Sequence, residues 1–562
     1  MPPPSARTRT ARCGLLARAA AAAAAVVAGA AGAPEGSCSA EDIAEDVSPV
    51  SLLQRARAGA ARLVDGGEAG ADGPRPRSRR RGRRGAVTEE LLQDAARAVE
   101  AEAKRVHGAL KHVGNLRGLD GHALASMWFQ AFTYTAHSAL SLFQSDGTVF
   151  VSTGDIKQMW LRDSSVQLEP YIPLAAKSSA ESPLRRVLEG AMLRQVRFIL
   201  SDPYASAFYS THGSGFDAGP NKRSCPPSAR CEECFCKTCA PECGDYTYQK
   251  DYELDSLLFP LMLHHRYWAE TGSDAHLDAE FADALRVILS LLRTEQWHFS
   301  KSKYSYKPLQ GRFNEGIGLV WSFALPSDDQ VLAGYNIPQN IMLVVALRRA
   351  AEMAKGPMRD VVLAAELEKM AGSVDRAVRR YGVVPASGGD NIYAFQVDGW
   401  GNSTTMDDAN MPNLLWLPYL GYEDPAGLYE ATRRFVLSGE NRNFFSGKSF
   451  TLDGERQNGL SGLGSRHASH GLRLGARGRE CHDHCIWHLG VIMQGMTATS
   501  EEERRTCMEE ILSTSCRTNK LHEGFSPTDA CAYNRDGFGW ANALFSDWVL
   551  RDWLGPDASR VS

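Results

Sequence analysis

The sequence lacks the short motifs that identify several large classes of enzyme. It has no G-x-S-x-G segment, no phosphate-binding P-loop and no glycine-rich dinucleotide fingerprint between a strand and a helix. His522 and Glu523 form an HE pair, but the second histidine of a zinc protease does not follow, and no twelve-residue segment has the EF-hand pattern. These classes are left without support, and we predict neither a metal ion nor a cofactor.

An excess of charge and long alternating strands are also absent. The chain has 62 Lys and Arg against 66 Asp and Glu, a formal net charge of -4, which does not indicate a nucleic-acid partner. Extended stretches are short, such as residues 148–153 and 392–400. No repeat of fixed period is visible, which argues against a helical-repeat solenoid.

Amphipathic helical patterns dominate the chain from Val87 onward. Their apolar residues recur at spacings of three and four, and Thr88 is placed to cap the first of them. The predicted helices cover residues 88–114, 182–200, 252–270, 279–293, 338–356, 361–382, 427–438, 486–498, 501–516 and 539–554. Long loops rich in Gly, Asp and Trp join them, and long ordered loops are usually functional. This balance predicts an all-α fold, an α/α barrel whose loops form a pocket at one end.

The N-terminal residues indicate an oxidising compartment. Three arginines precede the apolar run from Ala19 to Ala33, so residues 1–33 are predicted to be a secretory signal, with an uncleaved anchor or an organelle-targeting peptide as alternatives. Residues 34–85 end in a basic run and are predicted to be a disordered linker, which leaves residues 86–562 as the catalytic domain. We therefore expect a protein of the secretory pathway, either extracellular or in the Golgi or endoplasmic reticulum lumen.

The cysteines agree with that location. Of the 13 cysteines, the twelve that follow Cys13 are an even number, consistent with full pairing. Six cysteines lie in an insertion at residues 225–243, as a disulfide knot or a zinc cluster, and the secretory signal favours disulfides. Cys481 and Cys485 are predicted to form a local clip.

The segment from Trp321 to Gln330, WSFALPSDDQ, places Asp328 beside Asp329 after an apolar run. Two ionised carboxylates this close repel each other. One interpretation is a helix N-terminus, with Ser327 as the cap and both acids in the first turn. The other is a catalytic carboxyl with a helper. This window leaves both open.

Other loops combine acids with tryptophan, as sugar sites do. Aromatic faces stack on sugar C–H groups while Arg and Asp bind vicinal hydroxyls, although a surface salt bridge beside a buried Trp has the same composition. The candidate substrate-binding residues are Asp155, Trp160, Arg162, Asp163, Asp329, Asp398, Trp400, Asp407, Asp408, Asn410 and His522. Asn402 also begins a glycosylation sequon. With Glu523 in an apolar C-terminal setting, carboxylates among tryptophans favour glycoside cleavage.

Several of these segments together resemble glycoside hydrolase family 125. They fall in order from about residue 120 to residue 552: STGDIKQMWLRDSSVQLEPYIPLA, YELDSLLFPL, PSDDQVLAGYNIPQNIMLVVAL, VDGWGNSTTMDDANMPNLLWLPYLGY, IWHLGVIMQGMT and LHEGFSPTDACAYNRDGFGWANALFSDWVL. The resemblance implies an (α/α)6 barrel and an inverting, metal-independent exo-α-1,6-mannosidase acting on α-mannosides. It places the general acid at Asp328 or Asp329, with Asp328 favoured, and the general base at Glu523. It also places Arg162 and Asp163 in the terminal-sugar subsite.

The chain departs from the family pattern at some positions. Leu325 stands where an arginine is expected, Gly524 replaces a common serine, and the insertion at 225–243 and the loop from Thr451 to Glu480 are atypical. The alternatives are a carbohydrate-binding protein that has lost catalysis, another inverting α/α-barrel glycosidase such as a glucosidase, and an interaction protein built around the cysteine cluster. A membrane association is expected only with an uncleaved anchor, and no oligomeric state is predicted.

Overall fold

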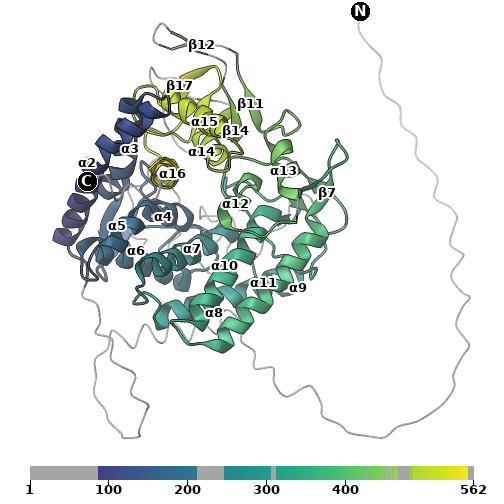
Figure 1. Ribbon diagram of the computed structural model, residues 1–562. Coiled ribbons are helices and arrows are strands. Elements are labelled where there is room, and N and C mark those ends of the chain that lie inside the picture. The colour runs from purple at the N-terminus through teal and green to yellow at the C-terminus, as the bar shows by residue number, and fades with distance from the viewer. Residues whose placement is uncertain are drawn as a thin grey trace, which may run out of the picture. The chain divides into compact units, whose positions relative to one another are not determined.

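Two concentric layers of helices form the body of the protein (Figure 1). The computed structural model describes residues 86–211, 246–304, 312–425, 427–448, 460–465, 481 and 484–554, together with the backbone of 450–452 and 455–457. All of them belong to one contact unit, Val47–Ser562. The signal, the linker and the Cys-rich insertion lie outside the described residues.

The inner layer is a closed ring. Its helices are α4 (Leu161–Leu168), α7 (Leu254–Thr271), α10 (Ile337–Lys355), α12 (Leu417–Leu420), α14 (His488–Met496) and α16 (Gly539–Trp548). Each contacts the next, with the short helix η3 (Leu414–Trp416) joining α12 to α14, and α16 closes the ring on α4. Large, almost fully buried side chains pack in and against this ring. They include Trp540 and Trp548 of α16, and Trp128 of the outer layer, which donates to Ser546 O of α16.

The outer layer alternates with the inner one along the chain. Its helices are α3 (Gly121–Ser138), α6 (Pro183–Ser201), α8 (Ala279–Glu295), α11 (Val361–Tyr381), α13 (Leu428–Val436) and α15 (Glu501–Thr514). Helix α2 (Glu89–Leu116) packs outside α3 and α6. Shorter helices are η1 (Glu169–Tyr171), α5 (Ile172–Lys177), α9 (His298–Lys301) and the π-helical η5 (Val549–Trp553). This alternation is the (α/α)6 barrel that the sequence predicted.

The ten predicted helices are all confirmed. Thr88 caps α2 as expected, because its hydroxyl accepts the backbone N–H of Leu91. Among the helices of eight residues or more, α3 and α4 were not predicted, and neither were the shorter α5, α9 and α12. Helix α4 was interpreted as part of a loop, which is wrong, because residues 161–168 are helical. All eight of its residues are buried although five of them are polar, so its sequence does not show the apolar core-facing side and polar exposed side of a surface helix.

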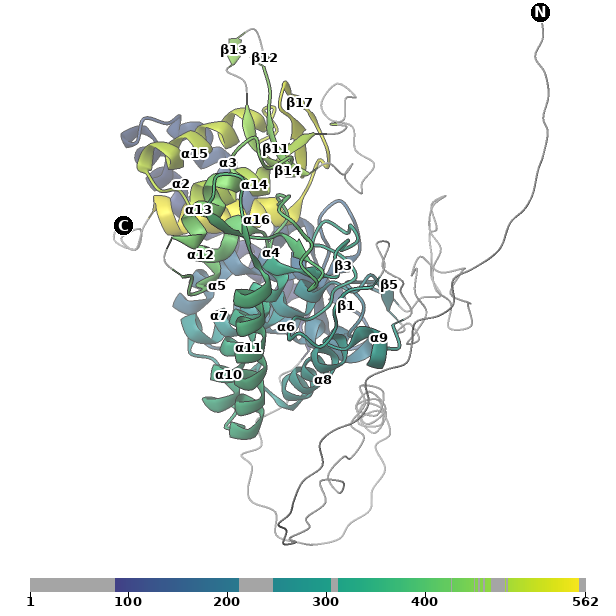
Figure 2. The ribbon, with the colours of Figure 1, turned by 90° about the vertical axis from the view of Figure 1, so that its right-hand side faces the viewer.

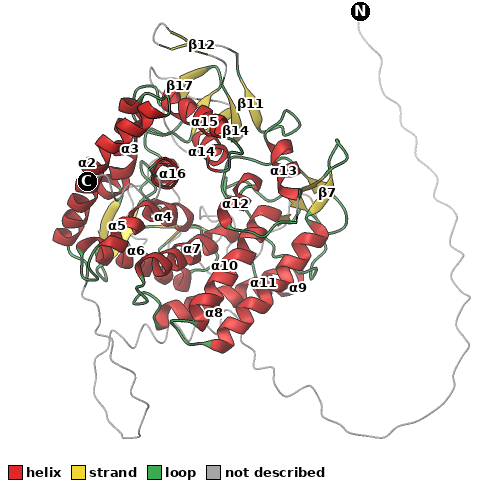
Figure 3. Cartoon of the chain, in the orientation of Figure 1, coloured by secondary structure: helices red, strands yellow, loops and turns green. Residues whose placement is uncertain are grey.

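Short strands lie in the loops between the helices (Figure 3). Strands β1 (Leu140–Phe143) and β2 (Thr148–Val151) form a hairpin, as do β7 (Val383–Pro385) with β8 (Asn391–Tyr393) and β12 (Phe450–Leu452) with β13 (Glu455–Gln457). Three-stranded sheets have the orders β3-β4-β5 (Met159–Trp160, Ala207–Phe208, Thr247–Gln249) and β10-β9-β6 (Ser403–Thr404, Gln396–Val397, Tyr335–Asn336).

One larger sheet covers the C-terminal part of the barrel, and it was not predicted. Its order is β11-β14-β15-β16-β17, and every pairing in it is antiparallel. The strands are β11 (Phe444–Ser446), β14 (Ser461–Ser465), β15 (Cys485–Trp487), β16 (Gly524–Ser526) and β17 (Asp529–Tyr533). Each is three to five residues long, too short for an alternating pattern to stand out.

Two disulfides lie in the same region. Cys481 pairs with Cys485, which confirms the predicted clip, and Cys516 pairs with Cys531. The expectation of full pairing is wrong at Cys507, an unpaired thiol buried on α15. Burial raises the pKa of this thiol to about 12, so it stays protonated and unreactive. In the described ranges, no helix combines the length and the apolar character needed to cross a bilayer.

The N-terminal ends of the inner helices carry the unusual residues of the sequence. Arg162 and Asp163 lie in the first turn of α4, Glu253 directly precedes α7, and Trp540 lies in the first turn of α16. Figure 2 shows the barrel from the side. Helix N-termini carry partial positive charge, so this end of the ring favours carboxylates and other oxygen ligands.

Candidate active site

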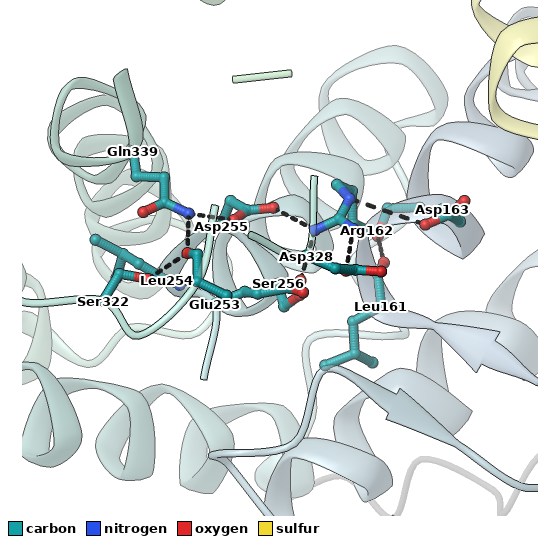
Figure 4. A network of polar contacts seen from close by, with 12 residues as sticks. Leu161, Arg162, Asp163, Glu253, Leu254, Asp255, Ser256, Ser322, Asp328 and Gln339 are labelled. Atoms are coloured by element: carbon teal, nitrogen blue, oxygen red, sulfur yellow. Dashed lines mark hydrogen bonds and ion pairs between the residues drawn. The ribbon is translucent and has the colours of Figure 1, made fainter. Parts of the chain in front are cut away.

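A buried arginine organises one half of the site. Arg162 is 3% exposed, and one of its nitrogens, Nη1, binds Glu253 Oε2 at 2.5 Å and Asp255 Oδ2 at 3.0 Å (Figure 4). Its other terminal nitrogen, Nη2, lies 3.7 Å from Asp328 Oδ1. The guanidinium also lies over the ring of Trp540, 5.1 Å from its centroid. Burial alone would lower the pKa of Arg162, but the surrounding carboxyls raise it well above its usual value.

Carboxyl groups outnumber the cations around Arg162. Glu253, Asp255, Asp163 and Asp328 all lie within 4 Å of this one guanidinium. One positive charge cannot neutralise four buried carboxylates, so some of them hold protons near neutral pH. Burial raises the pKa of Asp255 to about 6, although Arg162 opposes the shift. The site is therefore built to keep acids protonated.

Asp328 is the acid of the PSDD segment that faces this cluster. Burial raises its pKa to about 6, against the opposing influence of Arg162 and a hydrogen bond with Glu253. Its φ of 64° lies in the left-handed region, which is costly for a non-glycine residue and marks functional sites. Hydrogen bonds from Asp328 N to Leu325 O (3.0 Å) and from Leu325 N to Asp329 O (2.7 Å) hold this turn.

Asp329 has different partners. Its Oδ2 accepts the hydroxyl of Ser327 at 3.1 Å. Residues 326–328 form a turn and bend, and the next helix, α10, begins only at Ile337 with Asn336 as its cap. The interpretation of this segment as a helix N-terminus is therefore wrong. Leu325 packs instead in a small apolar cluster with Val331 and Phe395.

A second buried arginine organises the other half of the site. Arg535 is 3% exposed, binds Asp155 Oδ1 at 2.6 Å, and lies 3.9 Å from Glu523 Oε1 through its Nη1. Its guanidinium lies over Phe538, 5.1 Å from the ring centroid. Backbone pairing between Gly154 and Phe538 brings the Asp155 loop to this position. Glu523 itself is 7% exposed.

Asp163 connects the two halves. Burial raises its pKa, while the charges of both Arg162 and Arg535 act against that shift. Asp163 therefore lies within electrostatic reach of both cations. The predicted acid Asp328 borders the first arginine and the predicted base Glu523 borders the second. The two catalytic candidates, almost 200 residues apart in sequence, thus flank one buried charge network.

Two aromatic side chains, Trp160 and Tyr248, pack against each other, and Tyr248 lies near Asp328. Trp160 is buried immediately before α4 and packs edge-on against Tyr248, with ring centroids 5.6 Å apart. Burial and the charge of Asp328 both raise the pKa of the Tyr248 hydroxyl, which places that ring near the acid. An aromatic pair next to a carboxyl fits the sugar-stacking role predicted for Trp160.

His522 lies behind Glu523 in the protein interior. Its Nδ1 contacts Arg535 O at 2.8 Å, its Nε2 contacts the Thr518 hydroxyl at 3.2 Å, and its ring stacks on Tyr533 at 3.5 Å. Burial lowers its pKa to about 4, so the ring is neutral. Because both ring nitrogens contact protein groups, His522 holds the backbone near Glu523 and Arg535 in place.

The candidate substrate-binding residues between 398 and 410 lie in two separate parts of the structure, of which the first is the turn that carries Asp398 and Trp400. Asp398 Oδ1 accepts the backbone N–H of Trp400 at 2.8 Å, and Trp400 is 58% exposed on that turn. Asn402, the sequon residue, is exposed, and its amide donates to Asp398 Oδ2 at 2.6 Å. The contacts of this turn are local or with Asn314, not with the arginine network.

Asp407, Asp408 and Asn410 are buried just before η3. Asp407 accepts the backbone N–H of Leu414 at 3.1 Å, and Asp408 accepts that of Asn410 at 2.8 Å. Burial and the neighbouring Asp408 raise the pKa of Asp407 well above its usual value. These side chains brace the loop that enters the inner ring at the same end as the arginines.

The sequence reasoning missed four residues of the network. They are Glu253, Asp255, Arg535 and Trp540. A positional signal existed: Glu253-x-Asp255 opens its helix as Arg162-Asp163 opens α4, and Trp540 opens α16. A polar or aromatic residue at the start of each predicted inner helix would have marked them. In the described part of the chain no group of three or more His, Cys, Asp or Glu side chains is placed to hold a metal ion.

The disulfide between Cys516 and Cys531 encloses Glu523 and also holds strained backbone. Cys516, Arg517 and Asn519 all have positive φ values, between 49° and 61°. We expect the double variant Cys516→Ser, Cys531→Ser to lose about 3 kcal/mol of unfolding free energy, the entropy of a 15-residue loop. Denaturant unfolding measures this, and Cys507→Ala is the control that removes a cysteine but no disulfide. Equal stability of the double variant and the native protein would contradict it.

The comparisons with known proteins identify the family. The profile described as metal-independent alpha-mannosidase (GH125) matches residues 121–550. The chain belongs to glycoside hydrolase family 125. This GH125 chain is 30% identical to a Streptococcus pneumoniae protein of that mannosidase family, solved as a non-productive complex with α-1,6-mannobiose, with a TM-score of 0.66. The match covers 80% of this chain and 98% of the other.

A eukaryotic relative of the GH125 chain is the Meiotically up-regulated gene 157 protein of Schizosaccharomyces pombe. The two are 29% identical over 427 residues, which cover 71% of this chain and 76% of the relative. The resemblance found in the sequence is thus confirmed for family and fold. The GH125 chain is a glycosidase of the α-mannosidase class.

Proposed function

We propose that this GH125 chain is an inverting exo-α-1,6-mannosidase that removes terminal mannose from oligosaccharides or glycans. The observation that carries the proposal is the arrangement of Asp328 and Glu523 on either side of the Arg162–Asp163–Arg535 network. Glycoside hydrolysis with inversion needs one protonated and one ionised carboxyl on opposite faces of the scissile bond. The α-1,6 linkage is the one present in the complex of the Streptococcus pneumoniae relative.

Asp328 acts as the general acid in this proposal. Its buried position keeps a proton on it up to a pH of about 6, well above the range of an ordinary aspartate. The proton passes from its carboxyl to the glycosidic oxygen as the bond to the anomeric carbon breaks. Asp329, held by Ser327, supports the turn and does not donate the proton.

Glu523 acts as the general base. It takes a proton from a water molecule, and the resulting oxygen nucleophile attacks the anomeric carbon from the face opposite the leaving group. Arg535 lies 3.9 Å away and favours the ionised form of this carboxyl. Asp155, Arg162, Asp163 and Trp160 would contact the terminal mannose, whereas Asp398 and exposed Trp400 would meet the rest of the glycan at the rim.

The two disulfides are typical of proteins that fold outside the cytosol. We propose that the enzyme acts in the secretory pathway, on glycans of the lumen or the cell exterior.

Hydrolysis of α-1,6-mannobiose, followed by proton NMR from the first minutes, tests the proposed function. We expect β-mannose to accumulate before mutarotation, with α-1,2- and α-1,3-mannobiose cleaved much more slowly. Initial release of α-mannose would contradict inversion, and faster cleavage of another linkage would contradict the α-1,6 assignment. Binding without turnover would instead support a carbohydrate-binding protein.

A further inference from the structure

Glu253 lies against the predicted acid but belongs to a different segment of the chain. An isolated backbone bridge pairs Glu253 with Ala324, and Ala324 in turn pairs with Gln330. These pairings fold the loop that carries Asp328 back over the start of α7. Glu253 is 1% exposed, and its carboxyl and that of Asp328 lie against the same guanidinium: Glu253 Oε2 is 2.5 Å from Arg162 Nη1, and Asp328 Oδ1 is 3.7 Å from Arg162 Nη2. Figure 4 shows both side chains beside Arg162.

Two buried carboxyl groups that share one guanidinium repel each other when both are ionised, and a proton on one of them removes that repulsion and lets it donate a hydrogen bond to the other. The proton cannot come from Arg162, which remains charged, or from the serine that faces Glu253, because Ser256 already donates its hydroxyl to Glu253 Oε2 at 2.7 Å. We propose that Glu253 and Asp328 share one proton, and that Glu253 supplies it to Asp328 for donation to the glycosidic oxygen. This inference rests on the proposed function.

The surrounding charges favour this sharing. The titratable groups that face the pair are Arg162 and Asp163 from α4, Asp251 and Asp255 from the start of α7, and Tyr248 from β5. Burial and the charge of Asp328 raise the pKa of Glu253 to about 8, while burial raises that of Asp328 to about 6. The pair thus binds two protons at low pH, keeps one between about 6 and 8, and loses the last above that range.

The proton transfer balances in two steps. The O–H bond of Glu253 breaks as an O–H bond forms on Asp328 along their hydrogen bond. The Asp328 O–H bond then breaks as the glycosidic oxygen takes the proton and the C–O bond to the anomeric carbon breaks. Both carboxyls end ionised, and solvent returns one proton before the next cycle. Activity should fall as the pH rises past about 8, where the Glu253–Asp328 pair loses its last proton, because the general acid must be protonated to act.

The pH dependence of kcat/KM for Glu253→Gln tests the inference. An amide keeps the size and can donate to Asp328 but holds no transferable proton. The basic limb should move from near pH 8 to near pH 6, so that kcat/KM at pH 8 falls about 100-fold while kcat/KM at pH 5 changes little. Glu189→Gln is the matched control: this glutamate is also buried, is bonded by Tyr267 at 2.8 Å, and lies on α6 outside the network. Its profile should coincide with the native one.

Ser256→Ala provides an independent second variant. In the native protein the Ser256 hydroxyl lowers the pKa of Glu253. Removing this hydroxyl should therefore shift the basic limb of the kcat/KM profile to higher pH. A basic limb of Glu253→Gln that coincides with the native limb would overturn the inference, as would equal loss of activity at pH 5 and pH 8. If circular dichroism shows that Glu253→Gln is unfolded, Ser256→Ala decides: a basic limb at the native pH in that variant would overturn the inference. Retained activity of Asp328→Asn would instead overturn the acid assignment in the proposed function.

Discussion

Asp328→Asn is expected to lower kcat on α-1,6-mannobiose by about 10² to 10⁴-fold, the contribution of a general acid. Asparagine preserves the shape of the side chain, but its amide has no acidic proton to give to the glycosidic oxygen. The turn at residues 325–329 should persist, because it is held by backbone hydrogen bonds of Leu325. Steady-state kinetics on purified, folded protein measure the effect.

A substrate with a good leaving group separates an acid defect from a folding defect. α-Mannosyl fluoride needs little protonation of its leaving group, so Asp328→Asn should cleave it far better, relative to the native enzyme, than it cleaves the disaccharide. Asp329→Asn is the matched control, since it makes the same change next door in a residue held by Ser327. The reverse pattern, with Asp329→Asn inactive and Asp328→Asn active, would transfer the acid role to Asp329.

Glu523→Gln is expected to lower kcat on both α-1,6-mannobiose and α-mannosyl fluoride by about 10³-fold or more. A better leaving group removes the need for the general acid, but the attacking water still needs the general base. The neutral amide cannot deprotonate water. Binding of α-1,6-mannobiose, measured by calorimetry, should remain within a few-fold of the native affinity, since Asp155, Arg162 and Asp163 are untouched.

The control for this variant is Glu502→Gln, the same change at an exposed position on α15. It should behave as the native enzyme. If Glu523→Gln retained substantial activity on α-mannosyl fluoride, the base would have to be another carboxyl of the Arg535 cluster, and Asp155 would be the first to examine. Together the two variants assign acid and base by opposite responses to the leaving group.

The larger features of the fold could be predicted from the sequence. Helices such as α2 and α11 have one buried and one exposed face, so their apolar residues recur with the helical period. Helix α4 could not be found in this way because the barrel surrounds it completely. Strands of three residues, such as β15 and β16, form because neighbouring loops meet, and they carry no periodic signal of their own.

Part of the site was also visible before the structure. The resemblance to GH125 selected the PSDD and HEG segments and the Arg162–Asp163 pair; the family match confirms the family, and the roles of these residues stay predictions. His522 was grouped with the predicted sugar contacts because it adjoins Glu523, but the two residues precede strand β16 and have different partners. In the folded protein its ring turns inward toward Tyr533.

The sequence by itself determined the helical barrel, the family and the segments that supply acids to one end of the ring. Tertiary structure alone decided which acid of the PSDD pair faces Arg162, because the left-handed turn at Asp328 and the bridge from Glu253 to Ala324 orient that loop. It also brought Arg535 to Asp155, 380 residues away in sequence, and Glu253 to Asp328. Electrostatic coupling depends on distance in space and on burial, and neither quantity can be read from the order of residues along the chain.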